Sequence, residues 1–331
     1  MASCEFCGKP LFVSEGRCVY CHRFVNGNGT PPPESSDLHL ELVNGMVFCT
    51  DGSYLKGDVV IPSEINGETV IGIAEKAFVN CSAMLSVSIP DSVSVICDSA
   101  FFRCETLTAV NFGNSVKNIG KASFRNCIGL TSLTFPDSLV TIGEEAFSEC
   151  RGLTEVKFGK ELRSIGLGAF SNCTSLNSVL FSDDLKEIGD KAFICCKSLT
   201  TITIPNSVKE IGKDAFRSCT HLETVDLGRS VHTIGNQAFN SCKKLNSIRI
   251  PSSVRIIGDR AFSDCTSLLY AFIDSSVWII GKDAFRSPNI QNVVISRHDY
   301  KKCKDTAGFP DSAVIRYNSL LKRLLKWIKP K

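Results

Sequence analysis

The chain has 331 residues, of which 43% are hydrophobic and 21% charged, and its formal net charge is +3. That length suits one large domain or two ordinary ones, and the near-neutral balance does not by itself indicate a nucleic-acid partner. From Arg297 to Lys331, ten Lys and Arg stand against three Asp, a net of +7, which leaves −4 for residues 1–296 by subtraction. The positive charge therefore belongs to one tail.

The N-terminal stretch MASCEFCGKP lacks the charged region and apolar run of a secretory signal. No stretch approaches the ~18 consecutive apolar residues of a membrane helix. Seventeen cysteines in such a chain fit a reducing compartment better than a disulfide framework. We expect a cytoplasmic protein, with the cell surface or secretion by a non-standard route as the alternative.

The first predicted element, residues 1–25, holds two Cys-x-x-Cys pairs and resembles the small zinc ribbon found at the front of many bacterial proteins. Four thiolates complete a tetrahedral zinc shell, and the metal supplies folding free energy that so short a piece cannot gain from a core. We expect one structural zinc ion. Its predicted ligands are Cys4, Cys7, Cys18 and Cys21.

Three alternatives remain for this element. The run CVYCH at 18–22 formally matches a c-type haem attachment motif, which needs export and leaves the first cysteine pair unexplained. Two disulfides would need an oxidising compartment, and His22 could replace one cysteine as a ligand. The cations Lys9, Arg17 and Arg23 are too few for a substantial phosphate contact, so nucleic-acid binding is unlikely here.

Residues 26–37, NGNGTPPPESSD, predict a flexible linker with a stiff proline section. LHLELV-NG-MVFC at 38–49 then predicts a hairpin, because Asn44-Gly45 supplies the two positive-φ residues of a type I′ turn. We assign 38–72 to an N-terminal capping hairpin and first coil.

An exact 23-residue period follows, in residues 73–296. Isoleucine precedes each repeat phenylalanine by five residues and cysteine follows it by three, until Pro288 takes the next cysteine place. The phenylalanines are Phe78, Phe101, Phe124, Phe147, Phe170, Phe193, Phe216, Phe239, Phe262 and Phe285. Repeats at such a period predict a solenoid.

One unit, IGDKAFICCKSLTTITIPNSVKE at 188–210, shows the expected local structure. The alternating segment LTTITI predicts a half-buried strand that Pro205 ends. The SVKEIG stretch suits a second short strand, and DKAFICC has room for no more than a helical turn. No single unit can enclose its own apolar residues, so about ten stacked coils would form continuous internal columns.

The column of nine repeat cysteines has a metal or redox interpretation and a structural one. Side chains on successive parallel coils point the same way, which is poor disulfide geometry, and free cysteine behaves as a small buried hydrophobe. We interpret this column as structural.

The unit resembles the 23-residue leucine-rich repeat of the BspA type, L-x-x-I-x-I-P-x-x-V-x-x-I-G-x-x-A-F-x-x-C, over roughly residues 45–296. Departures are Ala74 and Cys97 in place of Gly, and Met84 in place of Leu. The resemblance implies a leucine-rich-repeat solenoid: a curved, β-rich, right-handed stack with a parallel concave sheet, short second strands and helical turns. It also implies protein binding or adhesion rather than catalysis, since many relatives are microbial surface proteins.

Residues 297–331 are expected to form a C-terminal cap and a basic amphipathic helix. The octapeptide IGKDAFRS occurs at 211–218 and 280–287, and the second copy is assigned to the last coil. Within 318–329 one helical face is apolar and the other basic, which suits either a cap over the last coil or contact with a membrane surface or partner. The apolar residues are Leu320, Leu321, Leu324, Leu325 and Ile328.

No Walker loop, nucleotide-binding glycine motif or paired-carboxylate motif is present, and the five histidines share no repeat position. Cys303 lies in KKCKD, where flanking lysines would favour the thiolate, but a nucleophile also needs a base and a pocket. We therefore expect no enzyme.

The binding face predicted from the repeat is the outward side of the concave strands. Most residues there are small and polar, and the exceptions at its C-terminal end combine aromatic rings with an arginine, which is typical of binding hot spots. The alternative is that the tail folds over them. The candidate residues are Glu155, Lys157, Asp226, Arg249, Tyr270 and Phe272.

These observations predict a monomeric, non-catalytic scaffold that binds a protein partner of unknown identity on the concave face. A microbial adhesin or host-interaction surface protein is the first alternative. A nucleic-acid-associated protein that uses the ribbon and the basic tail is the second.

Overall fold

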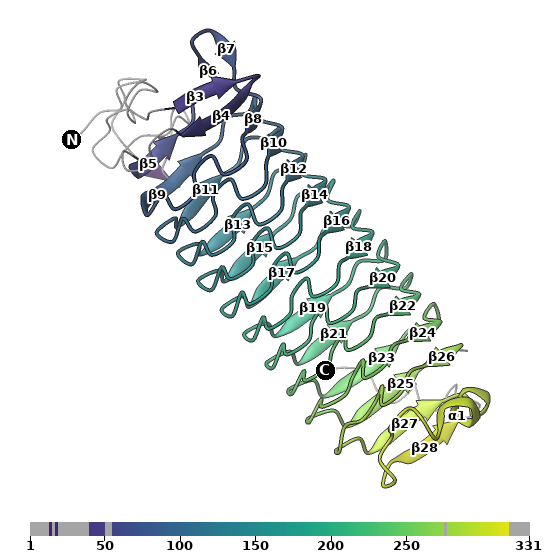
Figure 1. The fold of residues 1–331 in the computed structure, drawn as a ribbon. Helices are drawn as coiled ribbons and strands as arrows, with labels where there is room; N and C mark the ends of the chain where they lie inside the picture. The colour runs from purple at the N-terminus through teal and green to yellow at the C-terminus, as the bar shows by residue number, and fades with distance from the viewer. Residues whose placement is uncertain (1–12, 15–16, 19–39, 50–54, 275–276, 318–331) are drawn as a thin grey trace.

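The computed structural model describes residues 13–14, 17–18, 40–49, 55–274 and 277–317. Residues 55–317 form one parallel β-solenoid of about twelve turns, in which long strands lie along one side and two-residue strands along another (Figure 1). The expected solenoid is confirmed. The expected number of about ten coils is too low, because the first and last turns lack the repeat spacing of Ile, Phe and Cys.

The long strands are those of the predicted L-x-x-V-x-I segments. They pair in parallel within four separate sheets, ordered β11-β9-β5, β13-β15-β17, β19-β21 and β23-β25-β27-β28. Their bounds are β5 (Lys56–Val60), β9 (Ala83–Ser88), β11 (Ala109–Asn111), β13 (Ser132–Thr134), β15 (Glu155–Lys157), β17 (Ser178–Leu180), β19 (Thr201–Thr203), β21 (Thr224–Asp226), β23 (Ser247–Ile250), β25 (Tyr270–Ile273), β27 (Asn292–Ile295) and β28 (Val314–Tyr317).

The short strands end at the repeat isoleucine and form one continuous sheet with the N-terminal hairpin, 12 strands in all. Paired residues in successive short strands are 23 positions apart, as Ile165 and Ile188 are. Their bounds are β8 (Gly72–Ile73), β10 (Val95–Ile96), β12 (Asn118–Ile119), β14 (Thr141–Ile142), β16 (Ser164–Ile165), β18 (Glu187–Ile188), β20 (Glu210–Ile211), β22 (Thr233–Ile234), β24 (Ile256–Ile257) and β26 (Ile279–Ile280).

The glycine after the repeat isoleucine lets neighbouring coils approach closely. A Cβ atom on Gly143 would lie 2.7 Å from the carbonyl carbon of Gly120 and 2.9 Å from the backbone nitrogen of Lys121. Contacts that short are not tolerated without moving backbone. The repeat glycine is therefore a packing requirement of the stack.

The turn after each short strand is held by backbone hydrogen bonds to the next coil. In one turn the backbone N–H groups of Lys191, Phe193 and Cys195 donate to carbonyls of the following coil at 2.7–2.8 Å. Lys191 and Cys195 have φ of 56° and 61°, an uncommon conformation for residues other than glycine. Each turn thus depends on its neighbour, which is why no unit folds alone.

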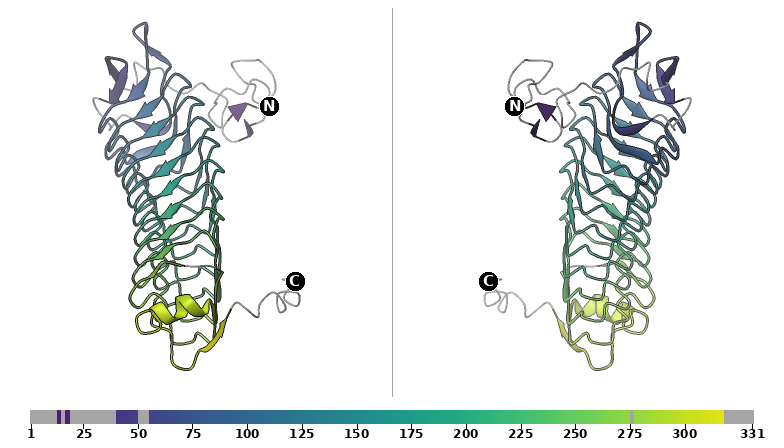
Figure 2. Two further views of the ribbon diagram at one scale, coloured as in Figure 1. Left: turned by 90° about the vertical axis from the view of Figure 1, so that its right-hand side faces the viewer. Right: turned by 90° about the vertical axis from the view of Figure 1, so that its left-hand side faces the viewer.

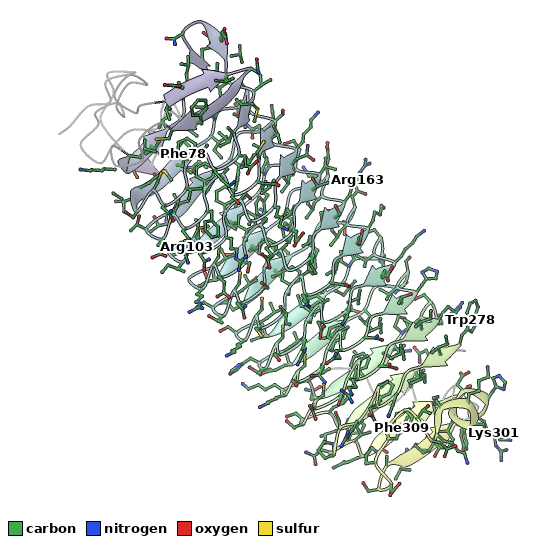
Figure 3. The ribbon with its side chains drawn as sticks, in the orientation of Figure 1. Phe78, Arg103, Arg163, Trp278, Lys301 and Phe309 are labelled. Atoms are coloured by element: carbon green, nitrogen blue, oxygen red, sulfur yellow. The ribbon has the colours of Figure 1, made fainter. Side chains whose placement is uncertain are left out.

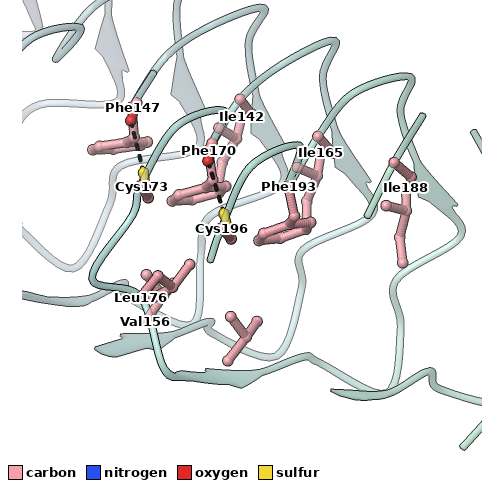
Figure 4. Close-up of a cluster of buried hydrophobic side chains, with 14 of the residues drawn as sticks. Ile142, Phe147, Val156, Ile165, Phe170, Cys173, Leu176, Ile188, Phe193 and Cys196 are labelled. Atoms are coloured by element: carbon pink, nitrogen blue, oxygen red, sulfur yellow. Dashed lines mark hydrogen bonds between the residues drawn. The ribbon is translucent and has the colours of Figure 1, made fainter. Parts of the chain in front are cut away.

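The core is a set of columns that run the length of the stack. The ten repeat phenylalanines are fully buried, and their rings stack in parallel with centroids 4.8–5.4 Å apart. Figure 4 shows Phe147, Phe170 and Phe193 in this column. The predicted internal columns are confirmed.

The repeat cysteines have a second role besides filling space. The Sγ of Cys173 donates a hydrogen bond to the carbonyl oxygen of Phe147 at 3.2 Å, and Cys196 does the same to Phe170 (Figure 4). Eight bonds of this kind run from Cys104 to Cys265. The carbonyl oxygen of Phe147 also accepts from the backbone N–H of Cys150 at 3.4 Å, so the thiol supplies a second hydrogen bond to this buried oxygen.

The N-terminal end is closed as predicted. β3 (Leu40–Val43) and β4 (Met46–Cys49) form an antiparallel hairpin with Val43 opposite Met46, and Asn44 and Gly45 have φ of 51° and 76°. β4 then pairs in parallel with β8. A second small hairpin, β6 (Glu64–Ile65) and β7 (Glu68–Thr69), follows β5.

At the C-terminal end the stack continues beyond residue 296. Helix α1 (Arg297–Cys303) follows β27, with Ser296 as its N-cap, and lies at the end of the stack (Figure 2). Phe309 then stacks on Phe285 with centroids 5.2 Å apart, and β28 pairs in parallel with β27. The coil that holds the second IGKDAFRS is therefore followed by one more, irregular coil.

Candidate binding face

The outward residues of the long strands make up what we call the long-strand face, the side that the resemblance implies is concave. Glu155 and Lys157 are exposed near its middle, on β15. In register with them on the next strand are Ser178 and Leu180. Leu180 is 55% exposed, which puts an apolar side chain beside the Lys157 cation.

A cluster of aromatic and basic side chains lies at the C-terminal end of this face. On β25 the rings of Tyr270 and Phe272 stack with centroids 6.3 Å apart, and Tyr270 is 40% exposed. Arg249 is in register with Phe272 on the neighbouring strand β23. Its Nε donates to Oδ2 of Asp274 at 2.6 Å, an ion pair that holds the guanidinium beside the rings.

The cluster continues onto β27 and β28. Tyr270 is in register with Asn292, which is in register with Val314, and Val314 is 52% exposed. Arg316 is exposed two residues further along β28. We call Arg249, Tyr270, Phe272, Val314 and Arg316 the aromatic patch.

The structure therefore brings three of the six predicted residues together, Arg249, Tyr270 and Phe272. Asp226 is exposed on β21, one coil before Arg249, but the partner of that arginine is Asp274. Glu155 and Lys157 lie several coils away and form a separate site on the same face.

Sequence reasoning missed Asp274, Val314 and Arg316 as parts of this face. The alternation in SAVIRY at 312–317 was the available signal for the last two, since it repeats the apolar-polar pattern of the long strands. The sequence alone favours the cap for that segment, because no repeat phenylalanine, isoleucine or cysteine accompanies it.

The short-strand side carries a row of cations that the repeat analysis also missed. The position two residues before the repeat isoleucine is exposed or half-buried in every regular coil. Acidic Glu187 and Glu210 occupy the adjacent position in two of the same coils, so positive charge is not concentrated there. The basic residues of the row are Lys117, Arg163, Lys186, Lys209 and Arg255.

The described residues contain no arrangement typical of catalysis. No group of three or more His, Cys, Asp or Glu in the described ranges could hold a metal ion. The prediction that lysines favour a Cys303 thiolate is wrong, because the side chain is buried at the end of α1. Burial, and next the Asp299 carboxylate, raise the pKa of the Cys303 thiol to about 11.

Some predicted elements fall outside this description. Cys4, Cys7, Cys21, the linker 26–37 and the segment 318–329 lie outside the described residues, and Cys18 is described only in its backbone. Among the described helices, none is long and apolar enough to cross a membrane.

Comparison with known proteins matches a model described as BspA type leucine rich repeat region (6 copies) to residues 71–200 and 186–307. A leucine-rich repeat protein from T. pallidum is 26% identical, with a TM-score of 0.48, over 65% of this chain and 91% of that one. A leucine-rich repeat protein from Bacteroides ovatus is 23% identical, with a TM-score of 0.34, over 84% and 97% of the two chains.

The pneumococcal vaccine antigen PcpA is 18% identical, with a TM-score of 0.41, over 85% of this chain and 88% of that one. No curated protein matches the chain at a comparable significance. With the matched regions spanning most of the stack, and with the stacked rings, repeat glycines and buried thiols described above, the chain belongs to the BspA-type leucine-rich repeat family.

Proposed function

We propose that this protein is a non-catalytic scaffold that binds a protein partner on its long-strand face, with the aromatic patch as the main anchor. Leucine-rich repeat proteins are generally protein-interaction or surface scaffolds. The observation that carries the proposal is the stacked pair of the exposed Tyr270 and the half-buried Phe272, beside Arg249 on a parallel sheet.

The physical reason is the composition of the patch. Tyrosine and arginine are enriched at binding hot spots: the tyrosine ring buries a large area with little loss of conformational freedom, and the planar guanidinium offers several hydrogen-bond donors. Here the parallel strands hold both rings in place, and the Asp274 carboxylate holds the guanidinium, so less entropy is lost on binding. A partner that supplies an apolar side chain and a carboxylate would complement this surface.

The test is affinity capture from the native cell extract with the full chain and with Tyr270→Ala/Phe272→Ala. We expect the variant to bind its partner about tenfold or more weakly. The matched control is Thr201→Ala/Thr203→Ala, which changes outward residues on β19 of the same face. If the variant retains the same proteins as the control, the aromatic patch is not the anchor.

We also propose that the N-terminal cysteines hold one structural zinc ion in a cytoplasmic protein. Four cysteine side chains are the donor set that zinc prefers in closed sites. Strand β1 (Val13–Ser14), which lies between the two Cys-x-x-Cys pairs, pairs antiparallel with β2 (Arg17–Cys18), which holds the first cysteine of the second pair. That antiparallel pairing supports bringing the pairs together.

Metal analysis and thiol titration test this part. We expect one zinc per chain, lost in Cys4→Ser/Cys7→Ser and kept in the control Cys303→Ser. Two disulfides and no zinc would instead favour the exported adhesin.

A further inference from the structure

The last short strand leaves an apolar sheet edge at the C-terminal end. β26 ends the 12-stranded sheet, and no strand among the described residues pairs with its outer side. Trp278 and Ile279 are 67% and 55% exposed there. Figure 3 shows Trp278 at the surface near the C-terminal end of the stack.

The composition of this edge differs from that of the coils before it. The positions equivalent to Trp278 in the eight preceding coils are mostly charged or polar: Ser94, Lys117, Val140, Arg163, Lys186, Lys209, His232 and Arg255. An aromatic residue appears only in the last of these coils, with the Arg255 guanidinium 5.8 Å from its ring centroid. A change from Lys or Arg to an exposed Trp, beside an exposed Ile279 whose equivalent Ile256 is half-buried, is expected where another segment covers the surface.

The backbone of the β26 edge also presents carbonyl groups at positions that accept hydrogen bonds in the other coils. In each coil the carbonyl at this position accepts hydrogen bonds from the next coil, as Arg255 does from the N–H groups of Trp278 and Ile279 at 2.8 and 3.1 Å. The carbonyls of Trp278 and Ile280 are the next acceptors in that series. Open edges of this kind are normally covered in stable proteins.

We propose that the C-terminal segment 318–328 of the same chain folds back and covers the β26 edge, with its apolar side chains on Trp278 and Ile279. In the regular coils the chain runs from each long strand directly toward the short-strand sheet. Residue 318 follows Tyr317, the last residue of the long strand β28, so the same path leads this segment past α1 to the short-strand side of the stack, where Trp278 and Ile279 are exposed.

The distance is within reach. In the coil of β25 and β26, five residues separate Ile273 from Trp278, and Tyr317 lies two strands beyond Ile273 in the same register. These steps place Tyr317 at most roughly 28 Å from Trp278, whereas eleven extended residues span about 37 Å. The segment also holds enough apolar side chains to cover both exposed residues of the edge, namely Leu320, Leu321, Leu324, Leu325, Trp327 and Ile328.

The two tryptophans of the chain, Trp278 and Trp327, supply the test. In the Trp327→Phe variant the fluorescence reports on Trp278 alone. We expect acrylamide to quench it severalfold less in the full chain than in a truncation that ends at Tyr317. Leu324→Lys/Leu325→Lys in the full chain should raise quenching as the truncation does, and the control Lys322→Ala/Lys326→Ala should not.

Thiol titration shows whether each variant is folded, since the buried repeat cysteines react only after unfolding. Equal quenching of Trp278 in folded full-length and truncated chains would overturn the proposal. Protection that rises with protein concentration would assign the edge to a second copy. In Trp278→Phe, an emission of Trp327 that shifts to the blue only when phosphatidylserine vesicles are added would assign the segment to a membrane surface.

Discussion

The interior coils and the last described coil solve the same packing problem with different residues. In the interior, paired residues are 23 positions apart, a cysteine thiol donates to the phenylalanine carbonyl, and a short strand follows each long one. In the last coil β27 pairs with β25 at a separation of 22, and helix α1 replaces the short strand. Already in the coil before it, the Ser287 hydroxyl donates to the carbonyl of Phe262 at 3.0 Å, in the place of a cysteine.

This difference shows which features every coil needs in order to stack and which features are present only because the sequence repeats. Each coil needs a ring for the column, a small donor for the buried carbonyl and a backbone that reaches its neighbour. This part of the chain is one residue shorter than a regular repeat, so the hydrogen-bond donor is Ser287 and not the residue at position 288. Phe309 still stacks on Phe285. The requirement is chemical and not tied to cysteine.

The largest expected effect is a loss of unfolding free energy at alkaline pH. It arises in the coils that bury a cysteine thiol and not at Ser287, whose hydroxyl does not titrate. Burial raises the pKa of Cys265 to about 12 and, with Asp299, that of Cys303 to about 11, while unfolded thiols titrate near 8.5. The native state therefore keeps protons that the unfolded state loses. Stability should be intact below about pH 8.5 and fall above it by about 1.4 kcal/mol per pH unit for each buried thiol.

Urea unfolding at pH 7 and pH 9.5 measures this loss. Cys303→Ser should reduce the difference by the share of one thiol, because its window lies between about pH 8.5 and 11. A free energy of unfolding that is equal at both pH values would contradict the buried, protonated column.

Ring removal should separate the two kinds of coil next. Phe170 is fully buried between two rings, so Phe170→Ala should cost about 3–5 kcal/mol of unfolding free energy. Phe309 is half-buried with one ring neighbour, so Phe309→Ala should cost about 1–2 kcal/mol. Denaturant unfolding of both variants checks the order, and equal losses would show that the last coil is as tightly packed as the interior.

The glycine contact predicts an effect of intermediate size. Gly143→Ala places a methyl group against the preceding backbone and should cost about 1–3 kcal/mol. Gly168→Ala is the matched control: φ is +60° there but the nearest atom would be 3.5 Å away, so only the left-handed conformation is penalised, by about 1 kcal/mol. Thermal unfolding distinguishes them, and a larger loss for Gly168→Ala would contradict close coil contact as the reason for glycine.

The smallest effect concerns the hydrogen bond of a single donor. Cys196→Ala removes one of the two hydrogen bonds to the carbonyl of Phe170, which keeps the backbone N–H of Cys173 as a donor at 3.4 Å, and should cost about 1 kcal/mol, whereas Cys196→Ser should recover part of that loss. Ser287→Ala should cost more than Cys196→Ala, because the Ser287 hydroxyl also accepts from the buried N–H of Cys265 at 3.0 Å. If serine is no better than alanine at 196, the thiol acts through volume alone.

Much of this architecture was predictable because the same pattern of apolar residues recurs in every repeat. The period placed the rings, the buried cysteines and both kinds of strand, and Asn44-Gly45 placed the hairpin turn. Helix α1 was missed although Ser296 and Asp299 carry its capping signal, with the backbone N–H of Asp299 bonded to the Ser296 hydroxyl at 3.0 Å. A single capping pair is weak evidence beside Pro288, which suggests in the sequence that the array ends there.

The candidate face was predictable only in part. Alternation along one strand indicates which side chains point outward, so Tyr270, Phe272 and Arg249 were found. Their completion by Val314 and Arg316 depends on β28 pairing with β27, a contact between segments that share no repeat pattern.

The amino-acid sequence by itself determined the coil length, the residues of the buried columns and the side chains of each strand that point inward. Side-chain periodicity follows from local backbone geometry, so it can be read from the sequence. Tertiary structure alone decided which sheet runs unbroken, where the stack ends and which carbonyls the thiols satisfy. Those features depend on contacts between neighbouring coils, and such contacts exist only once the coils are stacked.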